Sequence, residues 1–355
     1  MINISQVDAN FKIETEIDRD GLRFFDAKTE PFKLCGVFHD GKLYRRIPEA
    51  LAKSISEKIE YLSKNTAGGR VRFMTDSPYV AIKTVMPSKA AYSHMARTGE
   101  HGFDMYVTDS GTHKRVKTFI PPVEFEGGYE SVYDFVGEPK LRLITINFPL
   151  YSPLHELYIG IKEGSKLLPP TDYTVEKPIV YYGSSITQGG CASRPGTSYQ
   201  AIISRRYDAD YINLGFSGNG KGEPCMAEYI ANLDMSAFVF DYDHNAPTLE
   251  HYEKTHEPFF KIIRKKNPTL PIIFMTRPKA KSLLSAVEIG KFDVALETYN
   301  NAKRAGDENV YVNPGYELTE LDNDETTVDG THPTDLGFYF MAKRLAVELD
   351  KIFLK

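Results

Sequence analysis

Between residues 69 and 161, short apolar runs are separated by clusters of turn-forming residues. Such runs, with Gly, Pro, Asp and Ser at the breaks, predict short antiparallel strands. The segments that we expect to form strands are Val71 to Met74, Val80 to Met86, Phe103 to Val107, Val116 to Ile120, Leu141 to Phe148 and Leu157 to Ile161. Strands of this kind commonly pack as two sheets around one core. This part of the chain is therefore predicted to form an antiparallel, jelly-roll-like β-sandwich.

Two segments beside the sandwich have less definite patterns. In residues 50–62, Ile55, Ile59 and Leu62 fit one face of a helix, but the neighbouring pattern favours strands, so both structures stay open. The segment from Leu167 to Thr171 contains two prolines and has no period, which is typical of a linker. We therefore expect an N-terminal β-sandwich domain at residues 1–168 and a second domain at residues 169–355.

After the linker, short apolar strands alternate with longer helical stretches. We expect strands at Ile179 to Tyr182, Tyr211 to Leu214, Ala237 to Phe240, Ile272 to Met275 and Val310 to Val312. We expect helices at Ser198 to Tyr207, Pro224 to Asn232, Thr248 to Lys265, Leu283 to Ala305 and Thr334 to Ile352. Each crossover must pass over the sheet before the next parallel strand begins. The pattern predicts a flavodoxin-like three-layer α/β/α domain with a parallel sheet.

Polar loops follow several of these strands. Functional groups of an open parallel sheet gather at the carboxyl ends of its strands. The loops of interest are residues 183–189, 215–220, 241–247 and 329–333. Taken singly, each can be explained as a tight turn, a glycine-rich turn, a self-capped loop or a helix cap. Together they supply a serine nucleophile, a histidine base with a nearby carboxylate, and donors for an oxyanion.

In this combination the sequence resembles the SGNH (GDSL-like) hydrolase superfamily, whose four blocks contribute Ser, Gly, Asn and His in the same chain order. The resemblance covers roughly residues 178–350. Ser185 lies four positions before Gly189, as the family's nucleophile does, and this spacing selects Ser185 over Ser184. The last block, Asp329-Gly330-Thr331-His332-Pro333, matches the family's Asp-x-x-His-Pro.

Two blocks depart from the family's pattern. The usual Gly-Asp-Ser is here Gly183-Ser184-Ser185, so Ser184 replaces an Asp, and the usual Gly-x-Asn-Asp is here Asp243-His244-Asn245-Ala246. The N-terminal half is similar to the β-sandwich that precedes the hydrolase domain in one branch of the superfamily, at Ala67 to Arg70 and at Gly102 to Tyr106. In that branch the sandwich packs near the mouth of the active site.

The resemblance implies a serine esterase that works through an acyl-enzyme on Ser185. His332 is the implied base and Asp329 orients it, while the N–H groups of Ser185 and Gly218 and the side-chain amide of Asn245 hold the oxyanion. No cofactor and no metal are expected. We expect short acyl groups, acetyl above all, because no long apolar loop offers a lid. Carbohydrate esters are the expected substrates by analogy with other enzymes that carry a β-sandwich.

The geometry of the last loop can also be predicted. Only two residues separate Asp329 from His332, so the carboxylate should reach the imidazole, and the imidazole should face Ser185. We expect Pro333 in the first turn of the following helix. The apolar residues that should anchor this helix against the sheet are Leu336, Phe340 and Leu345.

Charge and cysteine content narrow the function classes. The formal net charge of −5 gives no basic surface for nucleic acid. No segment is apolar for long enough to span a bilayer, and residues 1–23 lack the apolar stretch of a signal peptide. Cys35, Cys191 and Cys225 have no paired spacing, which argues against a disulfide framework or a zinc cage. We expect a cytoplasmic protein without a membrane partner and leave open whether it forms a homo-oligomer.

Two other functions stay open at this point. A metal-dependent phosphoesterase is suggested by a set of neighbouring side chains, namely Asp241, Asp243, His244, His251 and His256. Against it, His251 and His256 are five residues apart on an expected helix, whereas a helical metal pair prefers four. The other alternative is a glycan-binding protein whose hydrolase domain has lost its activity.

Overall fold

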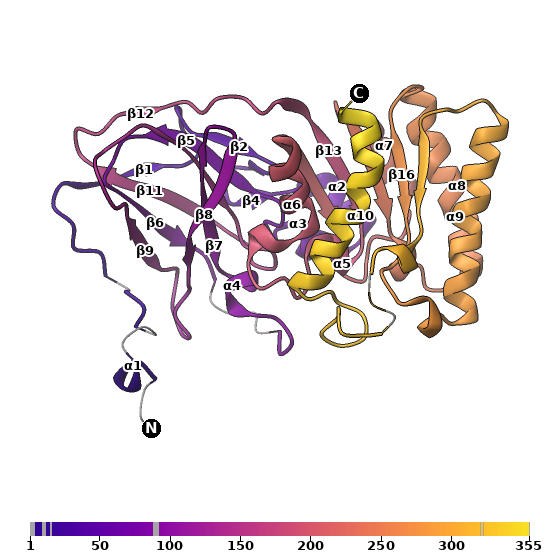
Figure 1. The fold of residues 1–355 in the computed structure, drawn as a ribbon, viewed down its shortest axis with the longest axis horizontal. Helices are drawn as coiled ribbons and strands as arrows, with labels where there is room; N and C mark the ends of the chain where they lie inside the picture. Colours follow the sequence, from indigo (N-terminus) through magenta and orange to yellow (C-terminus); the bar gives the residue numbers. More distant parts are fainter. Residues whose placement is uncertain are drawn as a thin grey trace.

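The computed structural model describes residues 4–8, 12–14, 16–87, 92–319, 321 and 323–354. Antiparallel sheets occupy one end of the molecule and a helix-covered parallel sheet occupies the other (Figure 1). The predicted fold class, an antiparallel β-sandwich followed by a three-layer α/β domain, is therefore confirmed. No helix among the described residues is sufficiently long and apolar to cross a bilayer.

Two antiparallel sheets enclose the core of the N-terminal half, and a short third sheet pairs β3 (Phe38–His39) with β4 (Tyr44–Arg45). The first has the strand order β1 (Leu22–Asp26), β11 (Glu156–Lys162), β6 (Tyr79–Val85), β9 (Glu130–Asp134). The second has the order β12 (Leu167–Leu168), β5 (Arg70–Thr75), β10 (Arg142–Asn147), β7 (Phe103–Asp109), β8 (Thr112–Phe119), and β2 (Lys33–Cys35) also pairs with β5. Alternate residues of facing strands, such as Phe73, Ile82, Ile144 and Ile159, fill the core between the sheets. The six predicted strands are present, and the two sheets also contain β1, β2, β9 and β12, which the sequence pattern did not predict.

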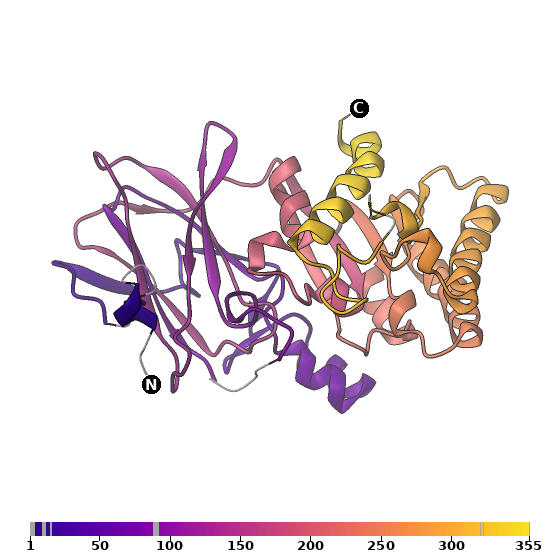
Figure 2. The ribbon, with the colours of Figure 1, turned by 60° about the horizontal axis from the view of Figure 1, so that its bottom comes forward.

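The ambiguous segment at residues 50–62 is helical. It forms α2 (Glu49–Ile55) and α3 (Glu57–Ser63), which meet at Ser56, and the Ser56 side chain caps α3 by accepting a hydrogen bond from the Ile59 N–H. Both helices lie at the junction of the two halves (Figure 2). Their buried residues Ala52, Ile59 and Leu62 belong to the same hydrophobic cluster as Phe216 and Met226 of the C-terminal half. These helices therefore precede most of the sandwich in sequence but complete the core of the other domain.

The C-terminal half is built on a parallel sheet with the order β14 (Ala209–Gly215), β13 (Val175–Gly183), β15 (Ala237–Asp241), β16 (Ile272–Met275), β17 (Val310–Asn313). One face packs against α7 (Pro224–Ala231), α8 (Leu249–Lys266) and α9 (Ala286–Arg304). The other face packs against the short α5 (Ser185–Gln188), α6 (Tyr199–Tyr207) and α10 (Asp335–Phe353). The five predicted strands and five predicted helices are all present. Helix α9 begins three residues late, because Ser285 and Glu288 form a capping box at its start.

The start and the buried face of α10 differ from the prediction. Thr334 is the N-cap, so Pro333 lies before the helix and not in its first turn. Leu336 is 44% exposed, and the buried side chains of the helix are instead Phe338, Met341, Leu345 and Leu349. The expected role of Leu336 is therefore wrong, Phe340 is only partly buried, and Leu345 lies in the core as expected. The helix starts later than expected and its apolar stripe follows Phe338.

Buried arginines join the two halves. Arg46 donates hydrogen bonds to the carbonyl oxygens of Gly215 and Leu62, and its guanidinium lies 4.6 Å from the centre of the Phe216 ring. Arg70 pairs with the Asp210 carboxylate and lies over the Tyr211 ring. Removing a buried charge from its partners is costly, so these contacts fix the orientation of the sandwich relative to the parallel sheet.

Candidate active site

Ser185 is placed by the end of the central strand. Strand β13 ends at Gly183. A Cβ at this position would overlap the Asp241 carbonyl oxygen, so only glycine fits here. Ser184 then caps α5: its Oγ accepts a hydrogen bond from the Ile186 N–H at 3.1 Å. The neighbouring hydroxyls thus have different partners, because Ser184 is used for the helix cap and Ser185 begins the helix with its Oγ directed elsewhere.

The Ser185 hydroxyl meets His332. The distance from Ser185 Oγ to His332 Nε2 is 2.9 Å, and the distance from His332 Nδ1 to Asp329 Oδ2 is 2.8 Å. The second carboxylate oxygen of Asp329 accepts the N–H groups of Thr331 at 3.1 Å and His332 at 2.8 Å. With Nδ1 donating to Asp329, Nε2 is the ring nitrogen that accepts the serine proton. The structure brings the three residues together as expected.

The charge of Asp329 is preserved by these contacts. Partial burial raises the pKa of the Asp329 carboxyl, but the backbone and side-chain hydrogen bonds from His332 outweigh burial and lower the pKa below its usual value. The carboxylate is therefore ionised at neutral pH. An ionised partner favours the protonated imidazole that must form when His332 takes a proton.

The loop that carries Asp329 and His332 is tied down by an arginine that sequence reasoning missed. Arg277, after β16, donates from Nη2 to the Gly330 carbonyl oxygen and to Thr331 Oγ1, each at 3.3 Å. Its Nη1 pairs with Glu288 at 2.6 Å at the start of α9. Arg277 is more than fifty residues away from Gly330 and Thr331 in the sequence, so no local pattern marks this contact and only the fold reveals it.

The three expected oxyanion donors lie on adjoining loops. Within the described part of the chain, the backbone N–H groups of Ser185 and Gly218 have no hydrogen-bond partner. Gly218 has φ +67°, and a Cβ there would meet no atom within 4 Å, so the backbone faces open space. Asn245 Nδ2 donates one hydrogen to the Phe216 carbonyl oxygen at 2.9 Å, which orients the amide and leaves its second hydrogen available.

The sandwich also holds the nucleophile loop. The Tyr151 hydroxyl donates to the Ser185 carbonyl oxygen at 3.1 Å. Gln188 Nε2 donates to the Leu150 carbonyl oxygen at 3.2 Å, while Gln188 Oε1 accepts the Ser217 N–H at 3.0 Å. Gln188 therefore links the nucleophile loop, the Gly218 loop and the N-terminal half. None of these positioning contacts was predicted, because residues so far apart in sequence give no signal of contact.

The residues that suggested a phosphoesterase do not assemble into a site. Burial raises the pKa values of the Asp241 and Asp243 carboxyls, and burial together with the charges of Arg277 and His332 lowers the pKa of His244 to about 4. His251 contacts the Lys221 carbonyl oxygen, while His256 is buried and contacts Thr298 Oγ1. The three His/Cys/Asp/Glu side chains of the described chain that lie close enough to hold a metal together are His94, Cys191 and His332, which include none of the five.

Sequence-family comparisons identify the family to which the two halves of the chain are similar. Residues 176–350 match the GDSL-like Lipase/Acylhydrolase family, and residues 22–167 match the N-terminus of Esterase_SGNH_hydro-type. The chain belongs to the GDSL-like lipase/acylhydrolase family. It is thus an SGNH-type hydrolase of the esterase class that carries an N-terminal β-sandwich domain. No curated protein is similar enough to the chain to count as a match.

Solved structures resemble this GDSL-like hydrolase over nearly its whole length. A protein from Bacteroides ovatus described as a GDSL-like lipase is 28% identical, with a TM-score of 0.84 over 93% of this chain and 98% of its own. The salicylyl-acyltransferase SsfX3 from a tetracycline biosynthetic pathway is 18% identical, with a TM-score of 0.78 over 94% and 98%. The acetyl xylan esterase Est2A from Butyrivibrio proteoclasticus is 14% identical, with a TM-score of 0.59 over 93% and 98%. The last two establish a shared fold only.

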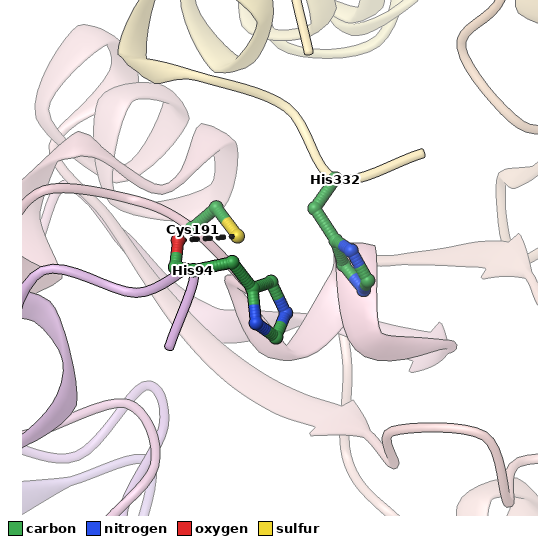
Figure 3. Close-up of side chains that lie close together, drawn as sticks. All are labelled: His94, Cys191 and His332. Carbon is green, nitrogen blue, oxygen red and sulfur yellow. Dashed lines mark hydrogen bonds between the residues drawn. The ribbon is translucent and has the colours of Figure 1, made fainter. Parts of the chain in front are cut away.

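Two features of this hydrolase lie beside the family's blocks. A pocket of about 280 Å³ is lined by the two residues that flank Gly218 and by residues of the N-terminal half, namely Glu57, Lys58, Tyr61, Leu62, Tyr92, Ser217 and Asn219. The second feature is the His94 ring, whose centre lies 5.3 Å from the centre of the His332 ring (Figure 3). Both features use residues from the sandwich half, so the N-terminal domain forms part of the surroundings of the site.

Proposed function

We propose that this hydrolase is a serine esterase that removes short acyl groups, acetyl above all, from carbohydrates. The observation that carries the reaction type is the continuous line of contacts from Ser185 Oγ through His332 to Asp329, at 2.9 and 2.8 Å. A hydroxyl, an imidazole and a carboxylate in this order generate a nucleophile at neutral pH without a cofactor. The same completeness argues against a glycan-binding protein that has lost its activity.

The proposed reaction has two halves. In the first, Ser185 Oγ bonds to the ester carbonyl carbon while its proton passes to His332 Nε2, and Nε2 then gives this proton to the departing alcohol oxygen. In the second, water gives a proton to Nε2 and attacks the acyl-enzyme, and Ser185 leaves with the proton returned. Asp329 stays ionised throughout and stabilises the imidazolium.

The oxyanion forms in front of three donors. The free N–H groups of Ser185 and Gly218 and the second amide hydrogen of Asn245 would point to the carbonyl oxygen as it gains charge. Asn245 is held by the Phe216 carbonyl oxygen before substrate arrives, so little reorganisation is needed during the reaction. Donors fixed in advance contribute more to the rate than donors that must first be ordered.

The pocket beside Gly218 supports a carbohydrate as the alcohol part of the ester. Tyr61 is 50% exposed there, and an exposed tyrosine offers a flat apolar face with a polar edge, which suits a sugar ring. Lys58 and Asn219 on the same pocket offer hydrogen-bond donors to sugar hydroxyls. The fold shared with the acetyl xylan esterase is in keeping with this substrate class.

The acyl and alcohol preferences can be measured separately. We expect p-nitrophenyl acetate to be cleaved with a higher kcat/KM than butyrate and octanoate esters, and acetylated xylo-oligosaccharides to release acetate. Tyr61→Ala should raise KM for the acetylated oligosaccharide and leave p-nitrophenyl acetate unaffected. Tyr339→Ala, a change of an equally exposed tyrosine on α10, is the control and should alter neither. Equal KM values for Tyr61→Ala and wild type on the oligosaccharide would show that the sugar does not bind in this pocket.

A further inference from the structure

Two metal-binding side chains lie next to His332 that the esterase reaction does not use. His94 comes from the sandwich half, and Cys191 follows the two glycines after α5; Figure 3 shows both beside the His332 ring. One nitrogen of each histidine and the Cys191 Sγ all lie within 4.8 Å of one another. Within the described ranges, this is the group of three such side chains that could hold one ion.

The types of these ligands identify the kind of ion. Two imidazole nitrogens and a thiolate form a set that Zn²⁺ prefers, whereas Mg²⁺ and Ca²⁺ require oxygen ligands. We propose that His94, Cys191 and His332 form an inhibitory Zn²⁺ site that shares the histidine of the esterase triad. A water molecule or a substrate oxygen would take the fourth position, as in zinc sites with three protein ligands.

The distances are compatible with closure around an ion. Zn–N and Zn–S bonds of about 2.1 and 2.3 Å in a tetrahedron place the ligand atoms roughly 3.5 Å apart. The ligand atoms must therefore approach by about 1 Å from the present limit of 4.8 Å. His94 is exposed and can rotate, and its own carbonyl oxygen already accepts a hydrogen bond from Cys191 Sγ at 3.3 Å. The segments that carry these two ligands are thus already in contact.

The backbone at Cys191 is unusual for a side chain of this type. Its φ is +72°, a left-handed conformation that only Ser110, Cys191 and Asp208 adopt among the described non-glycine residues. Residues other than Gly, Asn and Asp are disfavoured there, and strained positions gather at functional sites. In this conformation the Cys191 thiol lies beside the two imidazoles.

Binding would stop the esterase because both nitrogens of His332 are already in use. Nε2 contacts Ser185 and Nδ1 contacts Asp329, so a Zn–N bond to either nitrogen replaces one triad contact. The balance is simple: a Zn–S bond forms, the Cys191 thiol proton leaves to solvent, and the ion loses water molecules. The bound histidine can no longer relay a proton between Ser185 and the substrate.

The first experiment measures inhibition of the full-length enzyme by ZnSO₄ with p-nitrophenyl acetate as substrate. Wild type should be inhibited, and EDTA should restore the activity. His94→Ala and Cys191→Ser should keep the basal rate but need at least about tenfold more Zn²⁺ for half-inhibition, because loss of a ligand costs no less than loss of an outer partner. Cys225→Ser, which alters a thiol at the start of α7, is the matched control and should behave as wild type.

The second experiment measures binding without the reaction. Ser185→Ala protein should take up one Zn²⁺ per chain in competition with a chromophoric chelator, and His94→Ala should weaken this uptake. With Co²⁺ as the probe, the near-ultraviolet absorption band of a cobalt–thiolate bond should be present in Cys225→Ser and absent in Cys191→Ser. Unchanged half-inhibition in both ligand variants, or uptake that depends on neither His94 nor Cys191, would overturn the proposal.

The two readouts separate this site from the proposed function. Inhibition rests on the esterase activity, whereas metal uptake by Ser185→Ala does not. If metal-free wild type fails to cleave any ester, the proposed function fails and the binding titration still decides the zinc site. If Cys191→Ser does not fold, His94→Ala alone carries the test, since His94 is exposed and its removal leaves the core intact.

Discussion

The two sides of the proposed triad are held in different ways. Ser185 begins a helix directly after the central strand and is 5% exposed, so the backbone of the sheet and the helix cap place it. The side chains of His332 and Asp329 are 19% and 36% exposed and lie on a loop that hydrogen bonds tie down, including those from Arg277. The nucleophile is thus positioned by secondary structure and the base by side-chain contacts. Substitutions should reveal this difference as separate effects on chemistry and on loop stability.

The largest effect should come from the serine pair. Ser185→Ala should lower kcat by about four orders of magnitude or more, because the nucleophile is lost. Ser184→Ala should keep most of the activity and lose about 1 kcal/mol of stability, since it removes only a helix cap. Ester turnover and urea unfolding of both variants check this. Equal loss of turnover in both variants, with both still folded, would contradict the assignment of Ser185 as the nucleophile.

The next largest effect is expected at Asp329, the carboxylate on the loop that side-chain contacts hold in place. Asp329→Asn should lower kcat by about 10⁴-fold, because an amide favours the wrong tautomer of His332. The fold should be kept, since the amide can still accept the N–H groups of Thr331 and His332. Steady-state kinetics and circular dichroism of the same preparation test both parts. A rate within tenfold of wild type would show that Asp329 does not orient the imidazole.

A smaller effect is expected at the third oxyanion donor, which follows strand β15. Asn245→Ala should lower kcat by about 10²- to 10³-fold with little change in KM, because the interaction forms mainly in the transition state. A full kinetic curve with p-nitrophenyl acetate separates the two constants. A raised KM with unchanged kcat would instead make Asn245 a ground-state binding residue.

The smallest effect concerns the ion pair that supports Arg277. Burial raises the pKa of the Glu288 carboxyl, but hydrogen bonds from Ser285 and the charges of Arg277 and Lys279 outweigh it and lower the pKa from 4.5 to about 2. A carboxyl with a lowered folded-state pKa stabilises the protein above its unfolded pKa and loses this contribution as the pH falls toward the folded value. Wild type should therefore be more stable than Glu288→Gln by about 2 kcal/mol at pH 7, which is less than the roughly 3 kcal/mol of the full pKa shift because solvent screens this partly exposed pair. The difference in unfolding free energy should shrink below pH 4.5.

Urea unfolding at several pH values measures this difference. Glu250→Gln is the matched control, because Glu250 pairs with Lys254 on an exposed face of α8 and should contribute little at any pH. A Glu288→Gln difference that stays constant between pH 7 and pH 3 would mean that the carboxylate charge does not support the loop.

The sequence predicts the sheet-built part of the molecule well. The strands of the parallel sheet are apolar throughout because both faces are covered, and this pattern is easy to detect. Strands β1 and β9 escaped prediction because their residues are mixed in polarity and only partly buried. The buried face of α10 was misplaced for a related reason: several apolar residues of this helix, Leu336 and Val347 among them, are exposed, so the stripe is blurred.

At the site, the sequence predicts the residues that the four blocks mark and no others. Ser185, Gly218, Asn245, Asp329 and His332 lie on loops whose spacing can be recognised. Prediction from the sequence missed the positioning contacts of Tyr151, Gln188 and Arg277, each of which joins segments that are far apart in sequence. It also missed that His94 lies beside Cys191 and His332, which the esterase reaction does not require. Their contacts depend on how the sandwich meets the parallel sheet, and no local pattern encodes that arrangement.

Helices α2 and α3 limit how far the two halves can be treated as interchangeable modules. A cut at the proline linker would separate the hydrolase sheet from Ala52, Ile59 and Leu62, which cover Phe216 and Met226 in the intact chain. The excised fragment would expose an apolar surface right behind the loop that carries Gly218, and such surfaces promote aggregation. A designer who wishes to graft this catalytic unit onto another carrier must therefore take residues 46–65 with it, although they are encoded before most of the sandwich.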